Sequence, residues 1–531
     1  MTGLCREHRL PWESVAEELI TLGARTIYGL PDDSMGSASA FEHAGINLVV
    51  TAEQRTAVYA ASGTAQMTGG FGVAVAGRGP ATAALVPALL EASAQGAPIV
   101  VLVEIPNEEA VSDLSFQCVD PEPLLRPVCK EIISWNLGSV TLAKQRAEEA
   151  PSGPVVILVP EHKENGANEK DRAEAEPQKY VRSPTITSGK PNVPVFKRPI
   201  LLVGSGCKRS DVDVVAIAEQ LEAPIFVTAS GRGCIDEDHP SFLGLGGLYT
   251  SPPIREIWQS TDGVVALGSE LEETSLEFLP YRVPIHQVAL RRSPADWPDR
   301  PVKRHLVDVS SWSPSGIAHA EPEWRQMWEN ARSQALVWAE QMITSGRVPA
   351  ILDEISTLIR PGDSAVFENG ASDIWSYIWP IFRLPRDVVA LALSEQTTLG
   401  ASIPAAAALA RAHAENRTWS FSGDGAFIRS TLEPLVTEQE RIIYIVFDDG
   451  GYGWLAEQAR AAGLDPKRYA SEYPRHWHDA WGRPIESVLV ESAKDVERLA
   501  PHIEASSREQ AVVLHIPIKS TDRSPIAQGD W

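Results

Sequence analysis

The sequence predicts an α/β protein of three domains, each a mostly parallel sheet covered by helices on both faces. Two observations lead to this prediction. Short, continuously apolar segments alternate along the chain with segments of helical spacing, and uninterrupted apolar strands are typical of parallel sheets buried on both faces. The chain also has 531 residues, which is too many for one compact core and indicates several domains.

The alternation of strand and helix recurs in three regions. In the first, residues 12–23 have helical spacing and end on Gly23, a residue type that often terminates a helix. The expected strands of the first region are residues 26–28, 48–50, 72–76, 99–103 and 155–159. The second region starts with an apolar segment at residues 199–204. The expected strands of the third region are residues 365–367, 419–421, 441–447 and 511–516.

Polar and irregular segments separate these regions. Residues 161–196 are charged and contain prolines without any periodicity, which indicates a linker. The expected division is a first domain at residues 1–163, a linker at 164–196, a central domain at 197–318, a linker or helical connection at 319–346 and a third domain at 347–531.

The composition limits the partners and the compartment. A formal net charge of -23 argues against a nucleic acid or an anionic membrane as partner, because both would repel the surface. No segment approaches the ~20 apolar residues of a membrane span, and no apolar leader opens the chain. The 5 cysteines lack CxxC or zinc spacing, which is typical of free thiols. We therefore expect a cytoplasmic protein.

The strongest chemical signal is a pair of turns in the third domain, Gly423-Asp424-Gly425 and residues 448–453 (DDGGYG), each after an apolar strand. Glycines let the backbone approach a phosphate, and a helix N-terminus offers it N–H groups. An aspartate there can hold a cation that bridges phosphate groups. Either turn alone would be an ordinary turn. Together, with one helix and a return strand between them, they predict a Mg²⁺-diphosphate site at one edge of the sheet.

These turns resemble the diphosphate motif of thiamine-diphosphate-dependent enzymes, in which Gly-Asp-Gly is followed by a paired Asn-Asn. The resemblance implies that Asp424, Asp449 and the carbonyl of Gly451 bind Mg²⁺. The cofactor-binding residues that it implies here are Gly423, Asp424, Gly425, Ala426, Asp449, Gly451, Tyr452 and Gly453. In this chain Asp448-Asp449 replaces the paired asparagines, which adds negative charge beside the diphosphate.

The first domain carries the matching half of such a site. Residues 50–57 (VTAEQRTA) are similar to the family's strand followed by Glu-Gln, with Glu53 at the start of a helix. In the family this glutamate hydrogen-bonds N1′ of the aminopyrimidine and promotes loss of the C2 proton of the thiazolium. A glutamate at a helix start, taken alone, is more often only a partner of the helix dipole. With the diphosphate turns present, the resemblance implies that Glu53 is catalytic and binds the cofactor. The first domain is then the pyrimidine-binding domain, and the third the diphosphate-binding domain.

The resemblance covers nearly the whole chain and is most detailed with the acetolactate synthase branch. Ser115-Phe116-Gln117 resembles that branch's Phe-Gln segment, which implies that Gln117 is catalytic and that Phe116 walls the substrate pocket. Residues 397–404 resemble the segment that holds the cofactor in a bent shape, with Thr397 and Leu399 as cofactor contacts. Arg78 lies in a loop similar to the family's Gly-Pro-Gly-Ala-Thr loop. It is a candidate for binding a substrate carboxylate, with a structural role as the alternative.

Other segments depart from that branch. Residues 368–372 (ENGAS) look more like benzoylformate decarboxylase, with Asn369 and Gly370 as cofactor contacts. The branch's acceptor-pocket tryptophan corresponds to Gln458, and Trp454 is a second pocket candidate. Residues 269–273 (SELEE) replace a basic stretch tied to flavin binding, which argues against bound FAD.

Asp33 follows Gly29-Leu30-Pro31-Asp32, a segment that resembles a turn of pyruvate decarboxylase. The resemblance makes Asp33 a candidate acid/base, with an ordinary turn aspartate as the equal alternative. The paired histidines of that decarboxylase are absent from residues 112–116 (SDLSF), which argues against simple pyruvate decarboxylation.

The predicted function is an acetolactate synthase-like carboligase, which decarboxylates a 2-oxo acid and transfers the acyl anion equivalent to a carbonyl acceptor. The family places its site between subunits, so we expect a homodimer or a tetramer. The alternatives are a simple 2-oxo acid decarboxylase, a 2-hydroxy ketone lyase and a regulatory paralogue that binds thiamine diphosphate without catalysis.

Overall fold

The structure is a computed structural model in which the chain forms two compact units. The first unit comprises Met1–Ser183 with Glu433–Leu435, and the second comprises Pro184–Leu432 with Val436–Trp531. The residues that the structure describes are 11–30, 35–106, 119–160, 195–208, 210–290, 300–314, 320–385, 387–393, 398–413, 415–430, 441–469, 486–505, 512–519, 522 and 524.

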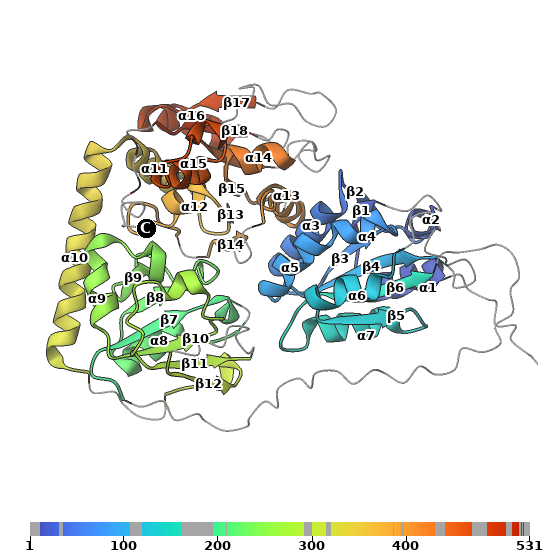
Figure 1. Cartoon of the computed structure of the whole chain (residues 1–531), viewed down its shortest axis with the longest axis horizontal. Helices are drawn as coiled ribbons and strands as arrows, with labels where there is room; N and C mark the ends of the chain where they lie inside the picture. The colour runs from blue at the N-terminus through green and yellow to red at the C-terminus, as the bar shows by residue number, and fades with distance from the viewer. Residues whose placement is uncertain are drawn as a thin grey trace, which may run out of the picture. The chain divides into compact units, whose positions relative to one another are not determined.

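The first unit contains one sheet of parallel strands in the order β2-β1-β3-β4-β6-β5 (Figure 1). Its strands are β1 (Thr26–Leu30), β2 (Asn47–Val50), β3 (Gly72–Ala76), β4 (Ile99–Ile105), β5 (Glu131–Ser134) and β6 (Val155–Pro160). Its helices are α1 (Pro11–Thr21), α2 (Gly36–His43), α3 (Gln54–Thr68), α4 (Pro80–Ala84), α5 (Val86–Ala94), α6 (Pro121–Leu125), the 3-10 turn η2 (Arg126–Val128) and α7 (Ser139–Glu148).

Helices cover both faces of this sheet. On one face, Val73 of β3 shares a buried core with Trp12 of α1 and Ala143 of α7. Successive residues of a strand point to opposite faces, so Gly72 faces the other side. A Cβ on Gly72 would lie 1.9 Å from the carbonyl oxygen of Ala61 in α3. The glycine therefore lets α3 approach the sheet at this point.

The second unit contains two further parallel sheets, the first of which has the order β12-β11-β10-β7-β8-β9. Its strands are β7 (Pro199–Val203), β8 (Ile225–Val227), β9 (Phe242–Leu245), β10 (Gly263–Leu267), β11 (Ile285–Ala289) and β12 (Val302–Leu306). Its helices and 3-10 turns are η3 (Ser205–Cys207), α8 (Val214–Leu221), η4 (Gly247–Tyr249), η5 (Pro252–Ile254), α9 (Arg255–Ser260), η6 (Glu273–Leu276) and η7 (Val309–Ser311).

The other sheet of this unit has the order β14-β13-β15-β16-β18-β17. Its strands are β13 (Ser364–Glu368), β14 (Val389–Leu393), β15 (Thr418–Gly423), β16 (Ile442–Asp448), β17 (Glu486–Leu489) and β18 (Val512–Pro517). Its helices and one 3-10 turn are α11 (Arg347–Leu358), α12 (Ala371–Ser376), α13 (Ser402–Ala412), α14 (Asp424–Ser430), α15 (Gly453–Ala461), η9 (Pro466–Tyr469) and α16 (Ala493–Ala505).

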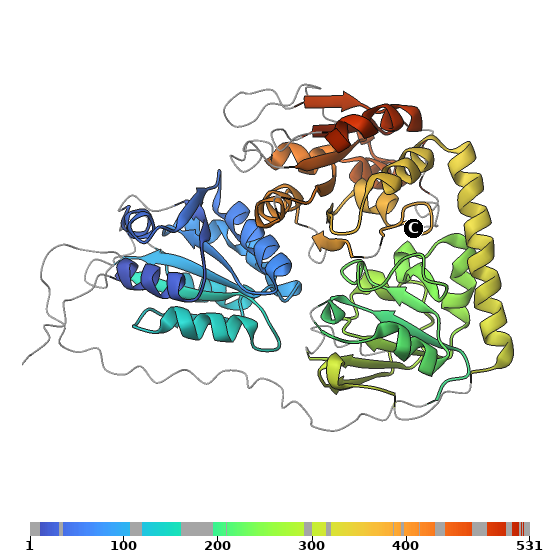
Figure 2. The same cartoon turned by 180° about the vertical axis from the view of Figure 1, so that it is seen from behind.

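A long helix, α10 (Pro322–Ser345), runs beside both sheets of the second unit (Figure 1 and Figure 2). It contacts η5 and α9 of one sheet and α11 of the other. Its buried side chains include Trp324, whose indole N–H donates to the carbonyl of Pro199 over 3.0 Å. This helix therefore joins the two sheets along one side.

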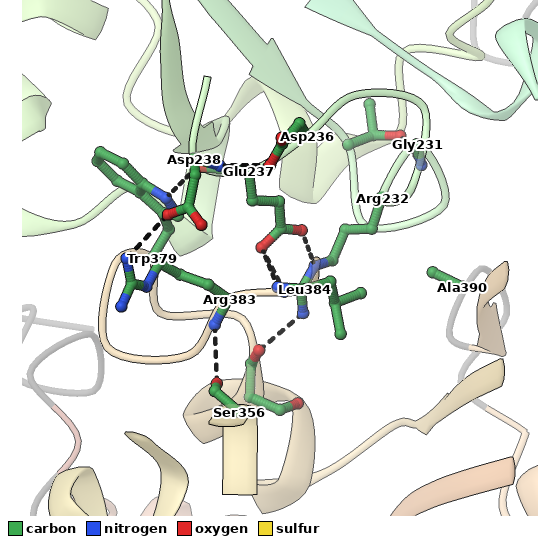
Figure 3. A network of polar contacts seen from close by, with 12 residues as sticks. Gly231, Arg232, Asp236, Glu237, Asp238, Ser356, Trp379, Arg383, Leu384 and Ala390 are labelled. Carbon is green, nitrogen blue, oxygen red and sulfur yellow. Dashed lines mark hydrogen bonds and ion pairs between the residues drawn. The ribbon is translucent and has the colours of Figure 1, made fainter. Parts of the chain in front are cut away.

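A buried ion pair joins the same two sheets more directly (Figure 3). Arg232 follows β8, and its guanidinium donates two hydrogen bonds to the carboxylate of Glu237, over 2.8 and 2.9 Å. It donates a third to the carbonyl of Ser376 in α12, over 2.8 Å. The Glu237 carboxylate in turn accepts from the backbone N–H of Leu384. These hydrogen bonds therefore connect the loop after β8 to α12 and to the segment that follows α12 in the third sheet's part of the unit.

The prediction of an α/β fold with three parallel sheets is confirmed. In the first and third sheets, the edge strands β5, β14 and β17 were not predicted from the sequence, and in the central sheet only β7 was predicted as a separate strand. Within the described residues, no helix has both the length and the hydropathy that crossing a membrane requires.

Candidate functional site

The two predicted turns lie at the ends of neighbouring parallel strands. β15 pairs with β16 in a register that places Gly423 opposite Phe447. Asp424 then begins α14, while Asp448 ends β16 and Asp449 follows it. Carboxyl ends of parallel strands lie at the same edge of a sheet, which is where ligands bind in α/β proteins. The strand register therefore brings the predicted acidic residues together.

Glycines make room around these carboxylates. A Cβ on Gly425 would lie 2.9 Å from the carbonyl oxygen of Gly451 and 3.1 Å from the ring of Tyr452. A Cβ on Gly453 would lie 1.9 Å from a carboxylate oxygen of Asp449. The Gly453 N–H donates to the other oxygen of that carboxylate over 3.2 Å. The glycine-rich turns are therefore needed for the backbone to come this close.

Asp424 is buried in a way that favours a cation. Its side chain is 1% exposed, and neither carboxylate oxygen accepts a hydrogen bond of normal geometry from the described residues. Burial, and then the charges of Asp449 and Asp448, raise the pKa of Asp424 to about 8. Burial also raises the pKa of Asp449 to about 6. A buried carboxylate without a partner is costly, and a divalent cation would remove that cost.

Asp448 has a different environment from its two neighbours. His515 of β18 lies on one side, with Nε2 2.5 Å from one carboxylate oxygen of Asp448. The backbone N–H of Gly450 donates to the other oxygen over 3.0 Å. The hydrogen bond from His515 lowers the pKa of Asp448, although burial acts in the opposite direction. Both oxygens of Asp448 are therefore engaged by the protein.

These residues fit a cation that is shared with a phosphate ligand. Among the described residues, no group of three or more His, Cys, Asp or Glu side chains could hold a metal by itself. Mg²⁺ commonly takes only one or two protein carboxylates and completes its shell with phosphate oxygens and water. Asp424 and Asp449 could supply the carboxylates and Gly451 a carbonyl oxygen.

A third strand end contributes to the same edge of this sheet, because β13 pairs with β15. Glu368 ends β13 and is buried. Its carboxylate accepts from the backbone N–H of Ser402 over 2.8 Å, and its carbonyl accepts from the Ser372 hydroxyl over 2.9 Å. Glu368 therefore anchors the starts of α13 and α12. The predicted contacts Asn369 and Gly370 lie directly between Glu368 and α12.

The structure also describes residues of the first unit that were predicted for the site. Glu53 is the N-cap residue of α3 and follows β2, as the sequence pattern predicted. Its carboxylate forms an ion pair with Arg55, and its side chain is 39% exposed in the single chain. Arg78 is half-buried in the loop between β3 and α4.

Several predicted residues lie outside the described residues. They are Asp33, Phe116, Gln117 and Thr397. Trp454 and Gln458 lie on α15, but their side chains are also outside the description. Leu399 is half-buried just before α13. Their functional roles remain predictions.

Sequence reasoning missed three buried polar residues of the second unit: Glu368, Asp373 and His515. His515 interrupts an otherwise apolar strand, and this isolated polar residue was the available signal. Asp373 lies on α12, where its carboxylate accepts from the Tyr249 hydroxyl over 3.0 Å. Burial raises the pKa of Asp373 to about 7.

The fold and this strand edge define a known class of protein. Three domain models of the thiamine pyrophosphate enzymes match, and together they cover more than half of the chain. They are the N-terminal TPP binding domain at residues 12–124, the central domain at 195–296 and the C-terminal TPP binding domain at 369–516. The chain belongs to the thiamine pyrophosphate enzyme family.

Within this family, its relatives include acetolactate synthases at low identity. The acetolactate synthase of Bacillus subtilis (strain 168) is 23% identical, with 97% of this chain and 94% of the relative covered. The acetolactate synthase isozyme 1 large subunit of Escherichia coli (strain K12) is 22% identical, with 96% and 94% covered. The chain is thus a divergent member of the acetolactate synthase-like branch.

Proposed function

We propose that the protein is a thiamine-diphosphate- and Mg²⁺-dependent carboligase, which decarboxylates a 2-oxo acid and joins the acyl group to a second carbonyl compound. The observation that carries this proposal is the buried Asp424 carboxylate, set among glycine-rich turns at the ends of β15 and β16. Asp424 and Asp449 would hold a divalent cation there, which would offset the charge of the phosphate groups. The acetolactate synthases among the relatives favour carboligation over other reactions of the family.

Each candidate residue has a proposed role around the cofactor. The bound cofactor supplies the electron sink for loss of CO₂. Glu53 holds the proton at N1′ of the aminopyrimidine. Gln117 and Asp33 polarise or protonate the reacting oxygens, and Phe116 excludes water from them. Arg78 binds the substrate carboxylate.

The proposal also covers the acceptor pocket, the need for FAD and the oligomeric state of the protein. Trp454 and Gln458, on α15, border the acceptor. Carboligation is redox-neutral and needs no FAD, and residues 269–273 place acidic groups where the branch has basic ones.

Glu53 is 39% exposed in the single chain, whereas proton transfer at N1′ needs a dry site. We propose that a second copy of the chain completes the site in a homodimer or tetramer.

The test uses purified full-length protein with thiamine diphosphate and Mg²⁺, supplied with a panel of 2-oxo acids with and without aldehyde or 2-oxo acid acceptors. CO₂ and the organic product are measured together. Ligated product in step with CO₂ supports the carboligase. CO₂ with free aldehyde indicates a decarboxylase instead, and cleavage of 2-hydroxy ketones without CO₂ indicates a lyase.

Glu53→Gln is the variant that tests the mechanism. It should reduce turnover by about 10²- to 10⁴-fold, the usual contribution of a positioned acid-base group, while cofactor binding persists. Glu42→Gln on the exposed side of α2 is the matched control and should leave turnover unchanged. Cofactor binding without turnover for any donor would favour the regulatory paralogue. Turnover that is undiminished in Glu53→Gln would contradict the mechanism.

A further inference from the structure

Asp448 and His515 form a pair to which the proposed function gives no role. Asp448 lies beside both proposed metal ligands, because it precedes Asp449 at the end of β16 and the paired strand β15 leads directly into Asp424. A third carboxylate beside a diphosphate opposes binding of that anion. Asp448 would therefore weaken binding of the diphosphate unless other groups of the protein hold its carboxylate.

The strand register places His515 next to the Asp448 carboxylate. β16 pairs with β18, and Val446 lies opposite His515. Residues 446 and 448 point to the same face of the sheet, so the imidazole and the Asp448 carboxylate share that face. Leu514 and Ile516 point to the opposite face, where they belong to the hydrophobic core. The alternation of the strand therefore places His515 on the same face as Asp448, whereas its two neighbours pack on the other face.

The contact is a buried one with a defined direction. His515 is 3% exposed, and its Nε2 lies 2.5 Å from a carboxylate oxygen of Asp448. An ionised carboxylate only accepts hydrogen bonds, so Nε2 carries the donated proton. With Gly450 N–H on the other oxygen, both ends of the carboxylate are held. Such charge-assisted bonds are stronger than neutral ones, and more so when water is excluded.

We propose that His515 is a positioning residue of the diphosphate site. It holds the Asp448 carboxylate by a hydrogen bond, so that Asp424 and Asp449 remain directed at the cation. This inference rests on the proposed function, because it concerns the same Mg²⁺ and thiamine diphosphate site. His515 acts through Asp448 and contacts neither the cation nor the cofactor.

The test compares His515→Gln, Asp448→Asn and the double variant in the full chain. Isothermal titration calorimetry measures binding of thiamine diphosphate at fixed Mg²⁺ and of Mg²⁺ at fixed thiamine diphosphate. Residues that orient metal ligands typically change metal affinity by about 10- to 100-fold, and we expect a loss of that size in His515→Gln. Asp448→Asn should bind nearly as well as the wild type. The double variant should recover the Asp448→Asn affinity, because no carboxylate then needs to be held.

The outcomes separate this inference from the proposed function. If the wild type binds no thiamine diphosphate in the presence of Mg²⁺, the proposed function fails. If the wild type binds and His515→Gln binds equally well, the role of His515 is refuted. A double variant that is as weak as His515→Gln would show that the histidine acts by packing. If His515→Gln does not fold, His515→Asn replaces it as the single variant, and binding as tight as that of the wild type again refutes the role of His515.

Discussion

Asp373→Asn should change how the stability of the second unit depends on pH. The Asp373 carboxyl is 3% exposed on α12, next to the Tyr249 hydroxyl. Burial raises its pKa from the ordinary value of 3.8 to about 7. The native protein therefore keeps a proton that the unfolded chain has already released between these two pH values. Stability from this carboxyl is fully present below the unfolded pKa and is lost as the pH rises through the folded pKa.

The size of the effect follows from the pKa difference. One pKa unit corresponds to about 1.4 kcal/mol, so this carboxyl lowers the free energy of unfolding by about 1.4 kcal/mol per pH unit across that range. Between pH 5 and pH 7 the decrease amounts to about 2–3 kcal/mol as an upper value, since local relaxation reduces it. Asparagine has nearly the same shape, can still accept from Tyr249 and does not titrate. The variant should therefore gain stability relative to the wild type as the pH rises.

The assay is urea unfolding without cofactor at several pH values from 5 to 7, followed by tryptophan fluorescence. The difference between variant and wild type cancels the titration of all other groups. Asp211→Asn, at an exposed position before α8, is the matched control and should show no such trend. A difference between Asp373→Asn and wild type that stays constant across the pH range would refute the reasoning.

Three further results are expected. Arg232→Met should destabilise the second unit by about 3–5 kcal/mol in urea unfolding, because it leaves the Glu237 carboxylate buried without its ion partner. A loss of stability under about 1 kcal/mol would contradict this. Gly453→Ala should abolish the rise in melting temperature that thiamine diphosphate and Mg²⁺ give the wild type, because the added Cβ would overlap the Asp449 carboxylate. Chelation of Mg²⁺ should remove the same rise from the wild type. Burial raises the pKa of the Cys207 thiol well above its usual range, so this thiol should react with Ellman's reagent only after unfolding. Rapid labelling of Cys207 in the native protein would contradict this.

Much of the fold and part of the site could be predicted from local patterns in the sequence. The apolar segment predicted at residues 441–447 is β16, shifted by one residue, and Glu53 lies at the predicted junction of strand and helix. Some edge strands were missed, although the edge strand β2 was predicted from its apolar residues. Strand β5 has four residues at the edge of its sheet, and its burial is partial, so its sequence lacks a continuous apolar run.

The environments of single polar residues could not be predicted, because they depend on distant parts of the chain. The Asp373 carboxylate meets a hydroxyl 124 residues away in sequence, and the Asp448 carboxylate meets an imidazole 67 residues away. The sequence showed the Asp-Asp departure from the family motif but not the histidine that contacts Asp448. The register of β16 and β18 brings Asp448 and His515 together, and packing of α12 against η4 brings Asp373 to Tyr249.

The Arg232–Glu237 pair has a consequence for how the chain can be divided. Its hydrogen bonds run from the loop after β8 to Ser376 and Leu384, so a cut between the central and third sheets would expose this buried ion pair and remove two of its backbone partners. Fragments for separate expression should therefore end within residues 161–194, keeping 195 onward in one piece. The two sheets also share one hydrophobic core, so a fragment that carries only the C-terminal cofactor-binding domain should aggregate unless its partner domain is co-expressed.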